Sequence, residues 1–220
     1  MSYQDVYQAL SQYRVIPIIA IESVDAALPL ADALIAGGLP VIEITFRTKA
    51  AEKVIEKLST ERPDLLIGAG TILNVDDLRA AKLAGARFAV APGLNPSVLA
   101  SAQKTHLPFM PGVATPSEVE QAMGLGASML KVFPAGVFGG MKLVKALSGP
   151  YGHTGVRFIP TGGVNGDNLA DYLAMPAVAA VGGTWLAPKS EIAAGNWDLI
   201  TERCTAAVAT AAASTTAPAH

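Results

Sequence analysis

One lysine of this chain stands where a charged side chain is costly. Lys131 interrupts the apolar stretch MLKVFPA (129–135), which has the length and composition of a buried strand. Burial and a nearby cation both favour the neutral amine, and a neutral amine is a good nucleophile toward a carbonyl carbon. The same position also suits a structural lysine in a buried ion pair. Position alone therefore favours a Schiff-base lysine and leaves the structural role open.

A second apolar stretch, VIEITFR (41–47), carries a carboxylate and a guanidinium. Glu43 and Arg47 are four residues apart, so a regular strand directs both side chains to one face. A buried carboxylate can move protons, and a guanidinium matches the geometry of a small carboxylate, to which Thr71 would add a hydroxyl. Each residue also has a structural alternative. Glu43 could be an ion-pair partner of Lys131 or Arg47, Arg47 could form a surface salt bridge, and Thr71 could cap a helix.

Glycine and threonine occur together at the ends of the last two apolar stretches. The motifs are TGG and GGT, and they contain Thr161, Gly162, Gly163, Gly183 and Thr184. Glycines let an anion approach backbone N–H groups, and threonines add hydroxyl donors. One such motif is more often a simple turn, but two on neighbouring strands predict a phosphate site.

Eight short apolar stretches recur along the chain, separated by amphipathic segments. The stretches are 15–21, 41–46, 65–72, 88–93, 108–114, 129–135, 156–163 and 178–185. The intervening segments have helical apolar spacing, capping residues near their starts and often glycine at their ends. Buried strands alternating with helices predict an α/β fold with a parallel sheet, and eight such units predict a closed (β/α)8 TIM barrel. Catalytic residues of such barrels lie at the C-terminal ends of the strands.

The two ends of the chain lie outside this repeating pattern. Residues 2–12 predict an extra N-terminal helix ahead of the first strand, and the segment 195–213 predicts a final helix. No linker divides the chain, so residues 1–213 predict a single catalytic domain. Residues 214–220 predict a flexible C-terminal tail.

Composition and charge argue against several classes of protein. Apolar residues make up 51% of the chain, which suits a large buried core, and the formal net charge is −2 without a basic run, so we expect no nucleic-acid partner. No apolar run is long enough to span a bilayer, the N-terminus lacks a signal-peptide core, and the lone Cys204 cannot form an intrachain disulfide. We therefore expect a cytoplasmic protein with no membrane partner.

The histidines do not form a metal site in this pattern. His106, His153 and His220 fall away from the expected catalytic ends of the strands, and no two have ligand spacing. We expect no metal and no cofactor, so the chemistry predicted around Lys131 is that of a metal-free nucleophile.

Motifs from most of the chain together resemble one known family. They are RVIPIIAI, EITFRT, GAGTIL, APGLNP, PGVATPSE, LKVFPA, PTGGV and GGTWL, between Arg14 and Pro188. In this combination the chain resembles the class I family of 2-keto-3-deoxy-6-phosphogluconate (KDPG) and 4-hydroxy-2-oxoglutarate aldolases. The resemblance implies a TIM-barrel lyase of the Entner–Doudoroff pathway, usually a homotrimer. Its substrate would be a phosphorylated keto acid, cleaved to pyruvate and glyceraldehyde 3-phosphate.

The resemblance also implies a role for each site residue. Lys131 would form the Schiff base and Glu43 would move protons. The residues expected around the pyruvate part are Arg47, Thr71, Pro92 and Phe133. Those expected around the phosphate part are Arg14, Thr161, Gly162, Gly163, Gly183 and Thr184. The family pattern has serine at the position of Thr184, so this chain keeps the hydroxyl and adds a methyl group.

Three alternatives stay open at the level of sequence. A sister aldolase would act on the 6-phosphogalactonate epimer, although Thr161 favours KDPG because the resemblance associates a residue without a hydroxyl with the galactonate enzymes. A barrel isomerase or decarboxylase of phosphosugars would share the phosphate site without using Lys131 as a nucleophile. A non-catalytic phospho-ligand binder is disfavoured, because Lys131, Glu43 and Arg47 cost stability without a structural return.

Overall fold

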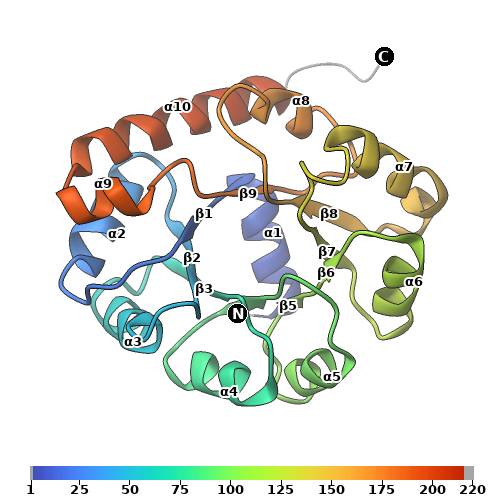
Figure 1. Cartoon of the computed structure of the whole chain (residues 1–220), viewed down its shortest axis with the longest axis horizontal. Coiled ribbons are helices and arrows are strands. Elements are labelled where there is room, and N and C mark those ends of the chain that lie inside the picture. Colours follow the sequence, from blue (N-terminus) through green and yellow to red (C-terminus); the bar gives the residue numbers. More distant parts are fainter. Residues whose placement is uncertain (1, 216–220) are drawn as a thin grey trace.

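Short parallel strands surround the centre of the molecule, most helices lie outside them, and the first helix lies at the centre of the ring (Figure 1). The computed structural model describes residues 2–215. Its strands are β1 (Val15–Ile19), β2 (Val41–Thr45), β3 (Leu66–Gly70), β4 (Phe88–Val90), β5 (Phe109–Met110), β6 (Gly112–Val113), β7 (Met129–Val132), β8 (Arg157–Pro160) and β9 (Val181–Gly183). Every predicted apolar stretch contains strand residues, so the prediction of an α/β fold with parallel strands is confirmed.

The strands form two parallel sheets. One has the order β5-β4-β3-β2-β1-β9 and the other β6-β7-β8. The fifth apolar stretch, expected as one strand over 108–114, is divided at Pro111 into β5 and β6, since proline has no N–H to donate to the ladder. Isolated parallel bridges pair Phe158 of β8 with Val178, and Thr161 with Gly182 of β9.

The helices alternate with the strands along the chain. They are α1 (Tyr3–Tyr13), α2 (Ala27–Ala36), α3 (Ala51–Glu61), α4 (Val75–Leu83), α5 (Pro96–Lys104), α6 (Pro116–Gly124), α7 (Met141–Tyr151), α8 (Leu169–Leu173), α9 (Lys189–Ala194) and α10 (Trp197–Thr215). Side chains fix several starts: Asn74 and Asn95 cap α4 and α5, and Thr115 forms a capping box with Glu118 at α6. None of the helices within residues 2–215 is both long and apolar enough to cross a membrane.

The chain ends differ in detail from the prediction. The expected N-terminal helix is confirmed as α1, which begins with a capping box between Ser2 and Asp5. The expected final helix is present as α10 but lies two residues further along the chain than predicted, because it begins at Trp197 and continues through Ser214 and Thr215, which were expected in the tail. Residues 216–220 of the expected tail lie outside the described residues.

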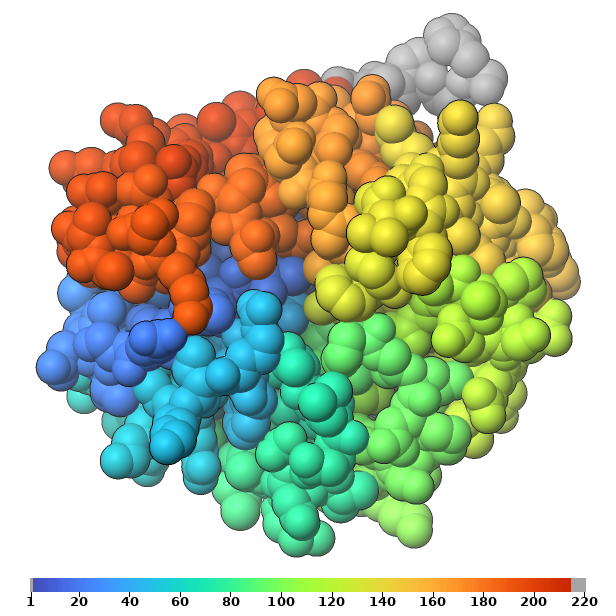
Figure 2. All heavy atoms as spheres, viewed as in Figure 1, coloured from blue at the N-terminus to red at the C-terminus, as the bar shows by residue number. Residues whose placement is uncertain are grey.

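Side chains of the strands alternate between two apolar layers. One set points outward and packs under the helices, as Ile42 and Ile44 of β2 do. The other set points toward the centre of the ring, where Val6 and Leu10 of α1 pack against Ile16, Val41, Leu66, Phe88, Val90, Met110, Met129, Ile159, Ala179 and Ala180. Figure 1 shows α1 at the centre of the ring, and Figure 2 shows that segments from most of the chain meet around the centre of the same view. This inner layer forms the floor below the functional site.

Candidate active site

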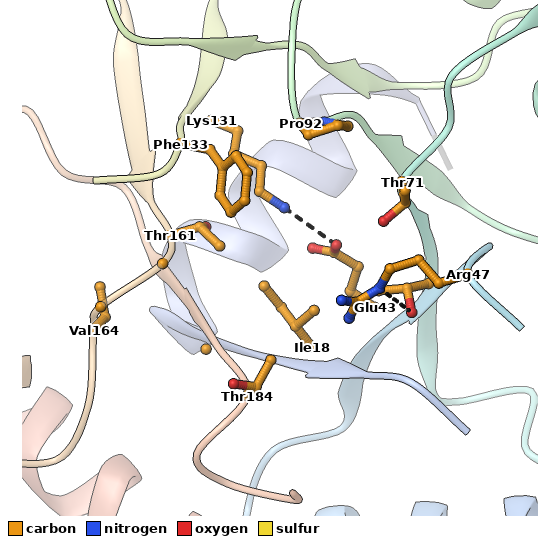
Figure 3. A pocket seen from close by; sticks show the side chains of 14 residues that line it. Ile18, Glu43, Arg47, Thr71, Pro92, Lys131, Phe133, Thr161, Val164 and Thr184 are labelled. Atoms are coloured by element: carbon orange, nitrogen blue, oxygen red, sulfur yellow. Dashed lines mark hydrogen bonds and ion pairs between the residues drawn. The ribbon is translucent and has the colours of Figure 1, made fainter. Parts of the chain in front are cut away.

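A cavity of about 260 Å³ opens at the C-terminal ends of the strands. Figure 3 shows its side chains converging from several strands. It is lined by Ile18, Glu43, Thr45, Arg47, Thr71, Pro92, Lys131, Phe133, Thr161, Gly162, Gly163, Val164, Gly183 and Thr184. Every residue predicted for the site lies here except Arg14. The positions are as expected for side chains that end parallel strands.

Lys131 and Glu43 meet at the bottom of this cavity. The Nζ atom of Lys131 lies 3.3 Å from Oε1 of Glu43, and their side chains are only 7% and 4% exposed. Each residue follows an inner-layer residue two positions earlier, Met129 and Val41, so strand alternation carries both groups to the centre. The amine also lies 5.6 Å from the ring centroid of Phe133. The nucleophile and the carboxylate predicted from sequence are therefore in hydrogen-bonding contact.

Glycine at position 70 makes room for this contact. The last residue of β3 pairs with Thr45 of β2, next to the Glu43 side chain. A Cβ atom added at Gly70 would lie 2.1 Å from Oε1 of Glu43. That distance is far below van der Waals contact, so any side chain at position 70 would displace the carboxylate. The GAG segment of β3 thus helps to hold Glu43 beside Lys131.

A guanidinium and two hydroxyls form one wall of the cavity. The Nε–H of Arg47 donates to Oγ1 of Thr45 over 3.3 Å, and the hydroxyl of Thr45 donates to the carbonyl oxygen of Ile19 over 3.0 Å. Thr71 follows β3 with φ of 61°, a left-handed conformation that is strained for a β-branched residue. Arg47 and Thr71 lie beside Glu43 in Figure 3, and their N–H and O–H groups can bind a small carboxylate.

Glycines form the opposite wall. Gly162 and Gly163 have φ of 85° and 89°, which an L side chain adopts only with strain. Within residues 2–215 their backbone amides donate no hydrogen bond. A Cβ atom at Gly183 would lie 1.6 Å from the ring of Trp185. With Thr161 and Thr184 beside them, these amides can receive an anion.

Arg14 is the exception, and its prediction as a phosphate ligand is wrong for this structure. It directly precedes β1, whereas the cavity lies beyond the other end of that strand. Its NH2 group donates to the carbonyl oxygen of Leu173 over 2.5 Å, and NH1 donates to that of Ala211 over 3.4 Å. These carbonyls belong to the C-terminal parts of α8 and α10, where a cation is favourable. Arg14 therefore joins two helices on the other side of the molecule.

Sequence reasoning missed three residues that line the cavity, Ile18, Thr45 and Val164. A signal for Thr45 was present, since it lies between Glu43 and Arg47 with the same strand parity. Val164 follows the TGG motif directly, and nothing in its type distinguishes it from other core valines. No group of three or more His, Cys, Asp or Glu side chains in residues 2–215 is placed to hold a metal ion.

The fold and the site define an α/β protein that presents a buried lysine–glutamate pair to a cavity lined on one side by Arg47 and Thr71 and on the other by glycines and threonines. The family model for KDPG and KHG aldolase matches residues 6–203, and the chain belongs to this family. The chain is 45% identical over 196 residues to the 2-dehydro-3-deoxy-phosphogluconate aldolase of Treponema pallidum, covering 89% of this chain and 92% of the relative. It is 48% identical over 184 residues to the corresponding aldolase of Pseudomonas aeruginosa, covering 84% and 83%.

A solved structure is similar along nearly the whole chain. It is KDPG aldolase from Legionella pneumophila, with pyruvate captured at low pH as a covalent carbinolamine intermediate. The TM-score is 0.88 at 44% identity, over 94% of this chain and 98% of the other. The family resemblance that the motifs indicated is thereby confirmed.

Proposed function

We propose that this protein is a class I aldolase that cleaves 2-dehydro-3-deoxy-6-phosphogluconate to pyruvate and glyceraldehyde 3-phosphate through a Schiff base on Lys131. The observation that carries the proposal is the buried Lys131 amine, 3.3 Å from the Glu43 carboxylate, at the bottom of a cavity with anion-binding groups on both sides. The named activities of the Treponema and Pseudomonas relatives and the carbinolamine in the Legionella enzyme support it.

The first half of the reaction forms the electron sink. Glu43 accepts a proton from the Lys131 ammonium, and the neutral amine attacks the C2 ketone to give a carbinolamine. Loss of water, with proton transfer through Glu43, leaves a protonated imine. Arg47 and Thr71 hold the substrate carboxylate, while Pro92 and Phe133 enclose the pyruvate part. The positive imine then withdraws electrons from the bond to be broken.

The second half breaks the carbon–carbon bond. Glu43 takes the proton of the C4 hydroxyl as the C3–C4 bond breaks, the bonding electrons pass to the imine as an enamine, and glyceraldehyde 3-phosphate leaves. Glu43 returns a proton to C3 of the enamine. Water then hydrolyses the resulting pyruvate imine and regenerates the Lys131 amine. Thr161, Gly162, Gly163, Gly183 and Thr184 bind the phosphate throughout.

The same carboxylate-binding wall would accept a smaller substrate. The matching family includes KHG aldolases, so we extend the proposal to 4-hydroxy-2-oxoglutarate, which shares the 2-keto acid part. This substrate has a second carboxylate on C4 in place of the longer phosphorylated chain, so it would contact the glycine wall less fully. We therefore expect weaker binding of 4-hydroxy-2-oxoglutarate than of the phosphorylated substrate.

Three structural predictions belong to this proposal. The first is that the two sheets make one closed (β/α)8 barrel in a single domain over 1–213, for which the bridges beside β8 and β9 are the support. The second is a homotrimer, which analytical ultracentrifugation would measure. Its support is a set of exposed apolar side chains that partner copies could cover, including Leu73, Val137 and Phe138. The third is a cytoplasmic location, which stays a prediction from composition.

Borohydride trapping tests the proposed nucleophile. The protein is incubated with pyruvate and sodium borohydride, digested, and the peptides are weighed. We expect a reduced pyruvate adduct on Lys131, loss of both adduct and aldol cleavage in Lys131→Ala, and unchanged behaviour in Lys145→Ala, which changes an exposed lysine. Cleavage that persists in Lys131→Ala, or an adduct confined to another lysine, would overturn the proposal.

A further inference from the structure

We infer that Thr45 is a positioning residue for Arg47: its hydroxyl orients the guanidinium that binds the substrate carboxylate. The inference rests on the proposed function and adds a residue to its machinery. Thr45 is the last residue of β2 and is 1% exposed, whereas the Arg47 side chain reaches the exposed rim of the cavity. The inference depends on the direction of two hydrogen bonds.

The hydroxyl of Thr45 has one hydrogen, and a backbone carbonyl uses it. Oγ1 donates to the carbonyl oxygen of Ile19 over 3.0 Å. Ile19 is the last residue of β1, and its last pairing with β2 is to Ile44, so this bond continues the contact between the strands by one residue. Because the hydrogen is committed to Ile19, the oxygen lone pairs remain to accept the Nε–H of Arg47, over 3.3 Å.

This hydrogen bond leaves the useful part of the guanidinium available. Arg47 uses only Nε toward Thr45, and no other described residue forms a hydrogen bond or ion pair with its terminal nitrogens. Two terminal N–H groups of one guanidinium can bind both oxygens of a carboxylate. An exposed arginine otherwise samples many rotamers, and fixing it before binding removes that entropic cost. Thr45 therefore pre-organises the carboxylate-binding wall.

The chain provides a matched control for the strand contact. Thr48 also donates its hydroxyl across from the end of β2, to the carbonyl oxygen of Ile21 over 2.7 Å, but it does not bind Arg47. Thr45→Val keeps the shape and removes the hydroxyl, Thr45→Ser keeps the hydroxyl, and Thr48→Val removes a comparable tie to the β1–α2 loop. A difference between the two valine variants thus isolates the contact with Arg47.

The test compares ketones with and without a carboxylate. For each variant the pyruvate concentration that gives half-maximal borohydride trapping on Lys131 is measured, and acetone is used in parallel. We expect Thr45→Val to raise this concentration for pyruvate about tenfold, the value of one hydrogen bond to a charged group, and to change it for acetone less than twofold. Thr45→Ser and Thr48→Val should resemble the parent. In an Arg47→Ala background, Thr45→Val should add no further loss.

The outcomes separate this inference from the proposed function. Absence of any adduct on Lys131 in the parent protein would refute the proposed function itself. A normal adduct in the parent with unchanged pyruvate dependence in Thr45→Val would refute only the role of Thr45. An equal loss for pyruvate and acetone would also refute it, because it would show a general disturbance of the site. If Thr45→Val does not fold, Thr45→Ala and Thr45→Cys are compared with Thr45→Ser in the same assay. Parent-like pyruvate dependence in all three variants would refute the positioning role of the Thr45 hydroxyl.

Discussion

The buried ion pair of Lys131 and Glu43 at the centre of the site lowers the stability that an apolar pair would give. Removing two charges from water costs several kcal/mol per ion, and one hydrogen-bonded contact of 3.3 Å between 7% and 4% exposed side chains repays this only in part. An apolar pair at these positions would continue the inner layer formed by Met129 and Val41. The charged pair is therefore explained by its proposed catalytic role, and the surrounding residues hold its two side chains in place.

Gly70 is the neighbour whose contribution is simplest to test. We predict that Gly70→Ala lowers kcat/KM for cleavage at least tenfold, because the new methyl group would lie 2.1 Å from Oε1 of Glu43 and must push the carboxylate away from Lys131. The control is Gly93→Ala, where an added Cβ meets no atom within 4 Å. Steady-state cleavage is measured for both, with circular dichroism to compare folding. Equal activity in the two variants would contradict the prediction.

Strand parity explains which site residues were predictable. Glu43 and Lys131 lie on β2 and β7, and Arg47 and Phe133 keep the same parity just beyond the ends of these strands, so their inward direction follows from alternation. Arg14 was assigned from resemblance and not from parity, and its partners at the ends of α8 and α10 depend on contacts more than 150 residues away in sequence. Such long-range contacts leave no local pattern. The hydrogen bond from Arg47 to Thr45 likewise depends on rotamers that spacing does not specify.

The helix α1 closes the end of the ring away from the cavity. Val6 and Leu10 are fully buried in the inner layer, and the capping box at Ser2 and Asp5 fixes the start of the helix. We predict that Leu10→Ala lowers the free energy of unfolding by about 2–5 kcal/mol, because it leaves a void that the surrounding strands cannot fill. Urea denaturation measures this loss.

The control for α1 deletes the same atoms where they are exposed. Leu83 at the end of α4 is 81% exposed, so Leu83→Ala should change the free energy of unfolding by less than about 0.5 kcal/mol. Leu10→Ala should also keep its kcat below the denaturation midpoint, since the catalytic strands remain. A loss in Leu10→Ala no larger than that in Leu83→Ala would show that α1 is not part of the cooperative core.

The contact between α2 and α10 can also be tested by substitution. Gly37 ends α2 against α10, where an added Cβ would lie 2.4 Å from Cβ of Cys204 and 2.9 Å from the carbonyl oxygen of Thr201. We predict that Gly37→Ala lowers the free energy of unfolding by about 1–3 kcal/mol through overpacking. Gly124→Ala, at the last residue of α6, meets no atom within 4 Å and should instead stabilise by about 0.4–1 kcal/mol. Thermal unfolding of both variants decides whether the two helices pack this closely.

The positions of the individual strands were predictable from the sequence, whereas their pairing into sheets was not. Each apolar stretch contains strand residues because buried parallel strands are apolar on both faces, which is a local property of the sequence. The division of the fifth stretch depends on Pro111 lacking an N–H, and the grouping of strands into two sheets depends on pairing between distant segments. The C-terminal part of the chain forms two helices, α9 and α10, instead of one. Gly195, with a left-handed φ of 69°, ends α9 two residues before α10 begins.

Cys204 of α10 is buried in the core, so ionisation of its thiol depends on whether the whole protein is folded. Burial raises the pKa of its thiol from 9.0 to about 12, since a thiolate is poorly solvated there. In the unfolded chain the thiol keeps its ordinary pKa. Above pH 9 the unfolded state therefore loses its proton while the folded state retains it, and stability falls as pH rises from about 9 toward 12. Below pH 8 the thiol is protonated in both states and contributes no slope.

The variant Cys204→Ala removes this dependence. We predict that the difference in free energy of unfolding between parent and Cys204→Ala is constant from pH 7 to 8. It should then shrink by about 1–2 kcal/mol by pH 10.5, since each pH unit in this window is worth at most about 1.4 kcal/mol for one proton. Urea denaturation in reducing buffer measures both proteins at each pH, and other titrating groups, such as Tyr7, whose pKa burial raises to about 12, cancel in the difference. A difference that stays constant to pH 10.5 would mean that the thiol ionises equally in both states, and hence that the packing of α10 over Cys204 opens without global unfolding.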